Sequence, residues 1–146
     1  MTYYVMDIDG TLANCDHRLH HIQREPKDWS AFFAACHLDT PHRHMIELTK
    51  HLQSHATVVF VSGRSDECKS QTIAWLENHG LFVGTNIWMR AKGDHRNDDV
   101  IKIEILERMI AHYGYPPVMA FDDRDRVVKA WRAAGIPCCQ VAEGDF

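Results

Sequence analysis

The stretch Val5-Met6-Asp7-Ile8-Asp9-Gly10-Thr11-Leu12 decides the fold class and carries the clearest chemical signal in the sequence. It runs from apolar residues into two carboxylates two positions apart, and Gly10 allows a sharp turn directly after them. A carboxylate at such a strand end can attack phosphorus, and a second can protonate the leaving oxygen and later take a proton from water. The alternative is an Asx–Gly turn that only closes a strand, and the DxDGT pattern is much more specific than that turn.

Short β-rich runs alternate with segments of helical spacing along the chain, which predicts an α/β fold with a parallel central sheet in three layers. Strands are expected at 3–6, 57–61, 86–89, 118–121 and 138–141. Helices are expected at 41–51 with Thr40 as N-cap, at 66–79, at 98–113 and at 124–134. Ligands in such folds bind at the carboxyl ends of the strands, so DxDGT should share an edge with the residues that follow the other strands.

The second strand is followed by Ser62-Gly63-Arg64. The Ser62 hydroxyl and free backbone N–H groups there could donate to phosphoryl oxygens, and Gly63 permits a close approach. Arg64 could add a bidentate contact to a phosphate or to its carrier. Taken alone, the same three residues are equally expected of a plain turn between a strand and a helix.

Two adjacent carboxylates, Asp122 and Asp123, follow the fourth strand and predict a bound cation. Mg²⁺ suits such an all-oxygen site, although either aspartate could instead cap the following helix. Lys102 stands near the start of another predicted helix, where a lysine opposes the helix dipole and needs a compensating anion. A phosphate would supply that anion, and a solvated lysine paired with Asp98 or Asp99 is the alternative.

Composition narrows the class of protein. The 146 residues fit one domain, 1–146, with a net charge of −4, which argues against an extensive grip on a nucleic-acid duplex. The apolar runs are too short to span a bilayer, no signal peptide is evident, and the five cysteines show no CxxC spacing, so we expect a cytoplasmic protein with no membrane partner. The eleven histidines are interpreted as surface residues, with metal binding as the alternative.

In the order DxDGT, SGR, Lys102 and Asp122-Asp123, these pieces resemble the haloacid dehalogenase (HAD) superfamily of phosphatases. The resemblance implies a Rossmann-like HAD fold in which Asp7 is the nucleophile and Asp9 the general acid and base. It also implies that Ser62 and Lys102 bind the phosphoryl group. Mg²⁺ would be held by Asp7, Asp123 and the carbonyl of Asp9, with Asp122 behind them.

The stretches WMRAKGDHRNDDVIKIEIL (88–106) and FDDRDRVVKAWRAAGIPCCQVAEGDF (121–146) are similar to the 3′-phosphatase domain of phage polynucleotide kinase-phosphatase. By that likeness Arg18, Arg64 and Asp98 join the substrate site. Arg90 and Arg96 are also expected near the site, as residues that bind the substrate or its phosphate. The sequence contains no GxxxxGK[ST] loop, and Met1 stands only six residues ahead of Asp7. The kinase half is therefore expected to be missing, and 5′-phosphorylation is not expected.

The segment between Ala13 and Thr40 is the expected source of any lid, with at most one small helix near Asp28–Phe33. Such a minimal, near-absent cap leaves room for a large substrate, so we expect removal of 3′-phosphates from DNA or RNA ends in nucleic-acid repair. A nucleoside monophosphate phosphatase is the alternative, and a non-catalytic end-binding module is a third. A homo-oligomer and a separate kinase or ligase partner are left open.

Overall fold

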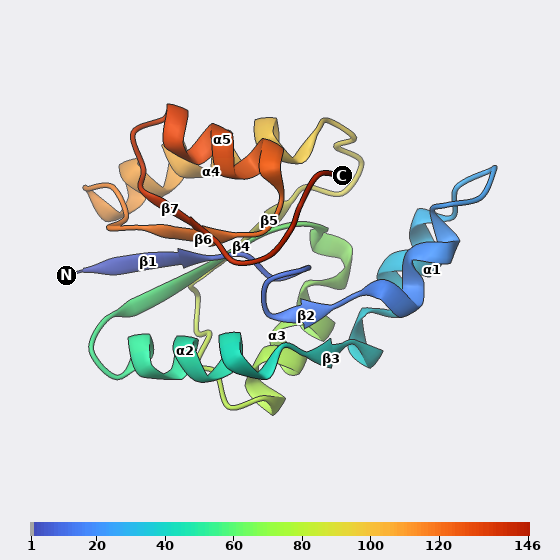
Figure 1. The fold of residues 1–146 in the computed structure, drawn as a ribbon, viewed down its shortest axis with the longest axis horizontal. Coiled ribbons are helices and arrows are strands. Elements are labelled where there is room, and N and C mark those ends of the chain that lie inside the picture. Colours follow the sequence, from blue (N-terminus) through green and yellow to red (C-terminus); the bar gives the residue numbers. More distant parts are fainter. Residues whose placement is uncertain (1) are drawn as a thin grey trace.

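The computed structural model describes residues 2–146, which form a body built on a five-stranded parallel sheet. The strands lie in the order β5-β4-β1-β6-β7, so the first strand is central and the chain winds outward on both sides (Figure 1). Their bounds are β1 Tyr3–Met6, β4 Thr57–Ser65, β5 Ile87–Arg90, β6 Ala120–Asp122 and β7 Cys138–Gln140. This architecture confirms the expected three-layer α/β fold.

Helices cover both faces of the sheet. Figure 1 shows α4 (Asp98–Tyr113) and α5 (Asp125–Ala133) on one face, and α2 (Arg43–Gln53) and α3 (Lys69–Asn78) on the other. Successive strand residues point to opposite faces, so Val59 packs with α4 and α5 whereas Phe60 packs with α2 and α3. Both faces are therefore apolar, as a parallel sheet between two helical layers requires.

The helix boundaries follow the sequence pattern closely with one exception. The helix at 98–113 has the expected bounds, and Gly114 ends it in the left-handed region. The helix expected at 41–51 is displaced, because Thr40 and Pro41 form strand β3 and α2 begins only at Arg43. Pairing of Pro41 with Ala13 and a hydrogen bond from the His42 amide to the Leu12 carbonyl, at 2.8 Å, hold this segment extended.

A small lobe, which we call the cap (residues 13–41), projects from the body after β1 (Figure 1). Strands β2 (Ala13–Asn14) and β3 (Thr40–Pro41) pair at its base, and α1 (Trp29–Ala34) is its one α-helix. The carboxylate of Asp28 accepts from the Ala31 amide at 3.0 Å and so caps α1. One short helix was expected there, whereas two 3₁₀ turns, at Asp16–His21 and Cys36–Leu38, were not.

Strand β4 is longer than expected, because it continues through Ser62-Gly63-Arg64 to Ser65. Its pairing with β5 shifts between Ser62 and Ser65, and such an irregularity turns the side chains near the end of a strand. The same edge of the sheet receives the ends of β1 and β6. In the part of the chain that the structure describes, no helix is long and apolar enough to cross a membrane.

Candidate active site

Asp7 lies at the end of the central strand and is almost fully buried, with 4% of its surface exposed. Its Oδ1 accepts from Nζ of Lys102 at 2.7 Å, and its Oδ2 accepts from the Thr11 hydroxyl at 2.8 Å. Burial and the nearby charge of Asp122 raise the pKa of Asp7 well above its usual range, and Lys102 opposes that rise. The carboxylate thus sits where a cation is needed to keep it ionised.

Asp123 faces Asp7 across a narrow gap formed by the turn after β1. Ligand oxygens of Asp7, Asp122 and Asp123 all lie within 4.8 Å of one another. Burial raises the pKa of Asp123 to about 6. At Gly10, where φ is +82°, a Cβ would lie 2.0 Å from Oδ2 of Asp123, so only glycine fits between the turn and this carboxylate. Three buried carboxylates with oxygen donors fit a divalent cation such as Mg²⁺.

Asp122, the third carboxylate of the trio, accepts hydrogen bonds from the protein through both of its oxygens. Its Oδ2 accepts from Lys102 at 2.8 Å and from the Trp131 indole at 3.4 Å. Its Oδ1 accepts from the backbone amides of Asp123 and Arg124, at 2.9 and 3.3 Å. These contacts agree with a supporting position for Asp122. The alternative, that Asp122 or Asp123 caps the following helix, is wrong, because Arg124 is the N-cap of α5 and no side chain caps it. Lys102, at 3% exposure, pairs with Asp7 and Asp122, so the solvated-lysine interpretation is wrong.

The second carboxylate of the motif, Asp9, belongs to a separate ionic network. Its Oδ1 accepts from Arg18 at 2.8 Å and from both Nε and an Nη of Arg64, at 3.0 and 2.7 Å. The buried carboxylate of Asp39 lies behind the two arginines and accepts from each of them at 2.8 Å. Asp39 comes from the cap and Arg64 from the body, so the network ties the cap to the site.

The charges in this network compensate one another. Burial alone would raise the pKa of Asp9, but the guanidinium groups of Arg64 and Arg18 hold it below its usual value. Burial would lower the pKa of Arg64, and the carboxylate of Asp9 raises it instead. Both guanidinium groups are fully buried, so each depends on its carboxylate partners for compensation.

Ser62 and Gly63 lie between the two groups of charges. The Ser62 hydroxyl is 1% exposed and accepts from the Arg64 amide at 3.1 Å. A Cβ at Gly63 would approach Oδ1 of Asp98 to 2.5 Å, which explains why glycine stands there. The Asp98 carboxylate accepts hydrogen bonds from Arg90 and Arg124, and Arg90 also donates to the Gly63 carbonyl at 2.7 Å. Arg90 and Asp98 therefore support the β4 turn directly.

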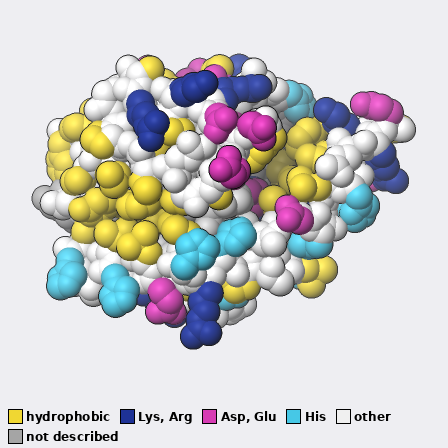
Figure 2. Space-filling view, in the orientation of Figure 1, with side chains coloured by type: hydrophobic (Ala, Val, Ile, Leu, Met, Phe, Trp, Pro, Cys, Tyr) yellow, Lys and Arg dark blue, Asp and Glu magenta, His cyan; other side chains and the backbone are white. Residues whose placement is uncertain are grey.

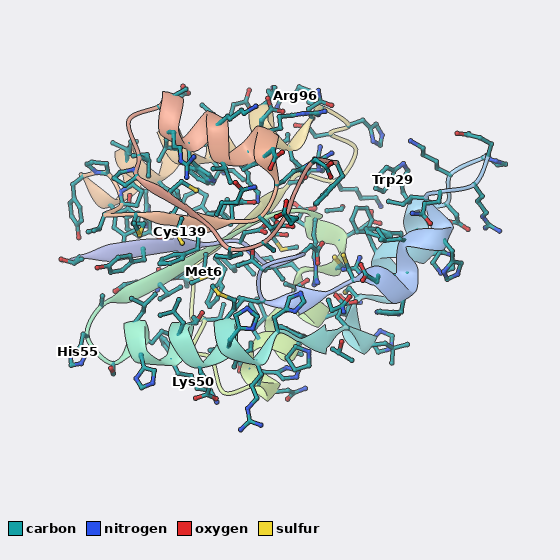
Figure 3. All side chains as sticks on the ribbon, viewed as in Figure 1. Met6, Trp29, Lys50, His55, Arg96 and Cys139 are labelled. Carbon is teal, nitrogen blue, oxygen red and sulfur yellow. The ribbon has the colours of Figure 1, made fainter. Side chains whose placement is uncertain are left out.

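Some of the residues expected near the site lie elsewhere. Arg96 pairs with Asp94 and Glu104 on the surface, and its side chain is 49% exposed (Figure 3). The histidine clusters form no metal site: within residues 2–146 the aspartate trio is the only group of three or more ligands that could hold a metal. The ring of His17 contacts Asp39 at 2.6 Å instead.

Two buried residues at the site were not expected from the sequence, Thr11 and Asp39. Thr11 stands inside the DxDGT motif, so its contact with Asp7 could have been anticipated from the position alone. Asp39 has no motif around it. Two buried arginines need more than one carboxylate partner, which predicts a further acidic residue near them. The sequence does not identify that residue, because the cap segment also contains Asp16, Glu25 and Asp28.

The full length of the chain, residues 1–146, matches the family described as the polynucleotide kinase PNKP phosphatase domain. The chain belongs to that family. The PNKP phosphatase domain is a HAD-type phosphatase, and this chain is accordingly a phosphatase with an α/β HAD fold. In this chain Asp7 and Asp9 follow β1, Ser62 lies near the end of β4, and Lys102 lies in the first turns of α4.

Individual relatives agree with this placement. A protein of the Autographa californica nuclear polyhedrosis virus, named for a bifunctional polynucleotide kinase/RNA ligase, is 33% identical over 82 residues, covering 56% of this chain. A chain of the Pnkp1/Rnl/Hen1 complex is 27% identical with a TM-score of 0.81, and the match covers 99% of this chain. The class C acid phosphatase of Bacillus anthracis shares the fold, at 15% identity, a TM-score of 0.65 and coverage of 97% of this chain and 68% of its own.

The first two of these relatives are much longer than this chain. This chain spans 12% of the viral protein and 47% of the chain from the Pnkp1/Rnl/Hen1 complex.

Proposed function

We propose that this chain is a Mg²⁺-dependent phosphomonoesterase that removes 3′-phosphates from polynucleotide ends through a phosphoryl group carried on Asp7. The observation that carries the proposal is the position of Asp7, buried at the end of β1 with Lys102 at 2.7 Å and Asp123 across the gap. Membership of the PNKP phosphatase family supports the proposed substrate class.

In the first step an oxygen of Asp7 attacks phosphorus, forming an O–P bond as the bond from phosphorus to the 3′-oxygen breaks. Asp9 gives its proton to that leaving oxygen. In the second step it takes a proton from a water molecule, whose oxygen bonds to phosphorus as the bond from Asp7 to phosphorus breaks and phosphate is released. Because both arginines bind Oδ1 of Asp9, we assign the proton transfers to Oδ2. A dianionic phosphate beside Asp9 would raise its pKa and so help it to carry the proton.

The remaining residues hold the phosphoryl group in place. In this proposal Lys102 and the Ser62 hydroxyl donate to its oxygens, and the Gly63 backbone N–H is assigned a further contact. Asp7 and Asp123, with the Asp9 carbonyl, would hold Mg²⁺, and Asp122 orients Lys102 beside them. The cation supplies charge neutralisation to the transferring phosphoryl group when it is bound.

The small cap supports a large substrate. Its only α-helix has six residues, which is too little chain to enclose a small molecule from all sides. A polynucleotide end can therefore approach the carboxyl edge of the sheet. One relative belongs to a structure described as an RNA repair complex, at 27% identity, and this supports a role beside a kinase or ligase.

The decisive experiment compares kcat/KM for a 3′-phosphorylated oligonucleotide with that for its 5′-phosphorylated isomer, in DNA and in RNA. We expect a ratio well above ten in favour of the 3′-phosphate. A ratio near or below one would defeat the 3′-end proposal, and faster phosphate release from free nucleotides would then favour a nucleotidase.

A further inference from the structure

Trp29 is a large aromatic side chain on α1 of the cap that remains 45% exposed. Figure 3 places it on the side of α1 that faces the body. Figure 2 shows hydrophobic side chains gathered in the hollow between the cap and the body. An exposed indole offers a flat apolar face, which favours a flat partner that can cover it.

Neighbouring aromatic rings fix the orientation of this indole. Trp29 stacks on Phe33 with ring centroids 5.9 Å apart and an angle of 28° between the planes. The Trp29 and Phe32 rings make an edge-to-face contact, with centroids 5.8 Å apart and an angle of 84° between the planes. Phe32 is buried, so it anchors the group to the cap. We call Trp29, Phe32 and Phe33 the aromatic shelf. Because its rings already pack on one another, the Trp29 side chain loses less conformational entropy when a ligand binds.

The aromatic shelf is continuous with the active site through Arg18. The guanidinium of Arg18 lies 4.3 Å from the centroid of the Phe32 ring and donates to the Phe32 carbonyl at 3.3 Å. The same guanidinium donates to Asp9 at 2.8 Å. These contacts of Arg18 therefore join the shelf to the carboxylate that we assign to proton transfer, so the shelf and this side of the active site form one packed unit.

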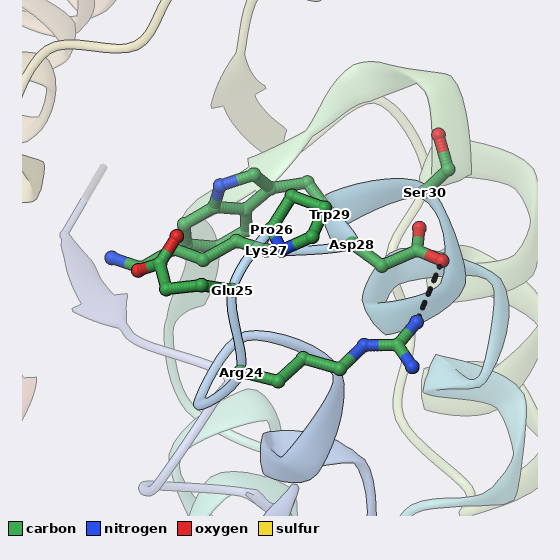
Figure 4. Close-up of a pocket in the computed structure, with 7 residues that line it drawn as sticks. All are labelled: Arg24, Glu25, Pro26, Lys27, Asp28, Trp29 and Ser30. Carbon is green, nitrogen blue, oxygen red and sulfur yellow. Dashed lines mark hydrogen bonds and ion pairs between the residues drawn. The ribbon is translucent and has the colours of Figure 1, made fainter.

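The charges around the shelf favour a neutral ligand. Trp29 and residues 24–28 line an open pocket of about 490 Å³ (Figure 4). Two cations, Arg24 and Lys27, are matched there by Glu25 and Asp28, and Arg24 pairs with Asp28 at 3.3 Å. With no net charge, the pocket is poorly suited to bind a phosphate group. A nucleobase is planar, neutral and aromatic, so it matches both the ring and its surroundings.

We propose that Trp29 stacks on the base of the nucleotide that carries the reacting 3′-phosphate, and so makes the site selective for nucleotide substrates over other phosphate esters. This inference rests on the proposed function and names the residue that recognises its substrate. Stacking on an aromatic side chain is sequence-tolerant, because every base has a π-face.

The test uses two 3′-phosphorylated oligonucleotides that differ only in whether the terminal nucleotide has a base or is abasic. For the unmodified protein, the abasic strand should have a kcat/KM lower by about 10-fold, the scale of one stacking contact. Trp29→Ala should lower kcat/KM for the intact strand by a similar factor, mainly through KM, and should remove most of the difference between the strands. Trp29→Phe should restore much of that difference. Equal discrimination by the unmodified protein and by Trp29→Ala would overturn the proposal.

A matched control is Phe82→Ala, because Phe82 is 72% exposed and belongs to the segment between α3 and β5. It should leave the kinetics with both strands unchanged. Binding of a 3′-hydroxyl strand provides a readout independent of turnover: it should quench indole fluorescence, and Trp29→Phe should abolish the quenching. If the 3′-to-5′ ratio is near one, the proposed function fails, yet the titration still decides this inference. Equal quenching by intact and abasic strands would overturn it.

Discussion

Asp7 and Asp123 place two carboxylates in one buried gap, where a proton or a cation must offset their repulsion. Burial is the main cause of the raised pKa of both groups, and the neighbouring charge of Asp122 adds to it. Lys102 provides one positive charge, which it shares between Asp7 and Asp122. A divalent cation would compete with protons for this gap, so binding of the metal should depend on pH.

We predict that thermal stabilisation by Mg²⁺ grows as the pH rises from 5 to 7.5. The pKa of Asp123 is about 6 in the folded protein against 3.8 ordinarily, so the folded state binds the extra proton more tightly. In the metal-free protein this contribution to stability is complete below about pH 4 and is lost as the pH rises through about 6. Mg²⁺ binds the ionised carboxylate, so the stability that the bound metal adds increases as the pH rises. Melting temperatures with Mg²⁺ and with EDTA measure both trends, and a pH-independent difference would contradict the prediction.

A second prediction concerns the nucleophile. Asp7→Asn should lose activity by roughly 10⁴-fold or more, the scale seen when a nucleophile is removed, because the amide cannot form the phosphoryl intermediate. Asp16→Asn changes an exposed aspartate of the cap in the same way and should retain normal turnover. Steady-state phosphate release with Mg²⁺ present is the measurement. Near-normal turnover by Asp7→Asn, with deamidation excluded by mass spectrometry, would show the assignment to be wrong.

At the scale of elements, the turn after β1 packs closely against the end of β6. The backbone at Gly10 therefore limits the space around the Asp123 carboxylate in the candidate metal site. Gly10→Ala should therefore abolish Mg²⁺ binding and activity, because its Cβ would meet Asp123 at 2.0 Å. Gly93→Ala is the matched control: φ is +85° there, similar to the +82° at Gly10, but no atom lies within 4 Å of the added Cβ. Both variants carry backbone strain of about 1 kcal/mol, so a difference in Mg²⁺ affinity isolates the contact with Asp123. Equal Mg²⁺ affinities in the two variants would contradict this account.

The junction between the cap and the body gives a fourth prediction. Asp39→Asn leaves Arg18 and Arg64 buried with one carboxylate fewer, which should lower the free energy of unfolding by about 3–5 kcal/mol. Asp28→Asn keeps an N-cap on α1 and should change it by less than about 0.5 kcal/mol. Denaturant unfolding of both variants measures the difference, and similar values would show that the network contributes little.

Only part of the fold and of the site could be predicted from the sequence. Residues 98–113 gave a helix with the right ends because apolar spacing and a terminal glycine agree. The helix start at Thr40-Pro41 was wrong because pairing with Ala13 overrides a local preference. DxDGT located Asp7 and Asp9, whereas the partner of the arginines, Asp39, is set by tertiary packing. The spacing of residues along the chain does not predict the contacts of Asp39 with the two arginines.

For the whole molecule, a net charge of −4 limits how many phosphates the surface can attract. We predict that binding of a 3′-hydroxyl oligonucleotide weakens with salt with a log–log slope of about −1 to −3, as expected for one to a few phosphate contacts. Fluorescence anisotropy between 50 and 300 mM salt measures it. A slope steeper than about −6 would require a basic surface that this composition does not provide.

The cap is joined to the body by buried charges, and this has a kinetic consequence. Swinging the cap away as a lid would break the two ion pairs that cross the junction, Asp39 with Arg64 and Arg18 with Asp9, at a cost of about 3–5 kcal/mol. Such an open state would be populated in fewer than about one molecule in a hundred. Hinge motion is therefore a poor candidate for the slow step of the catalytic cycle, unlike in enzymes that close a lid over each substrate. Substrate and product should instead enter and leave by diffusion of the strand end through an opening that stays accessible throughout the cycle.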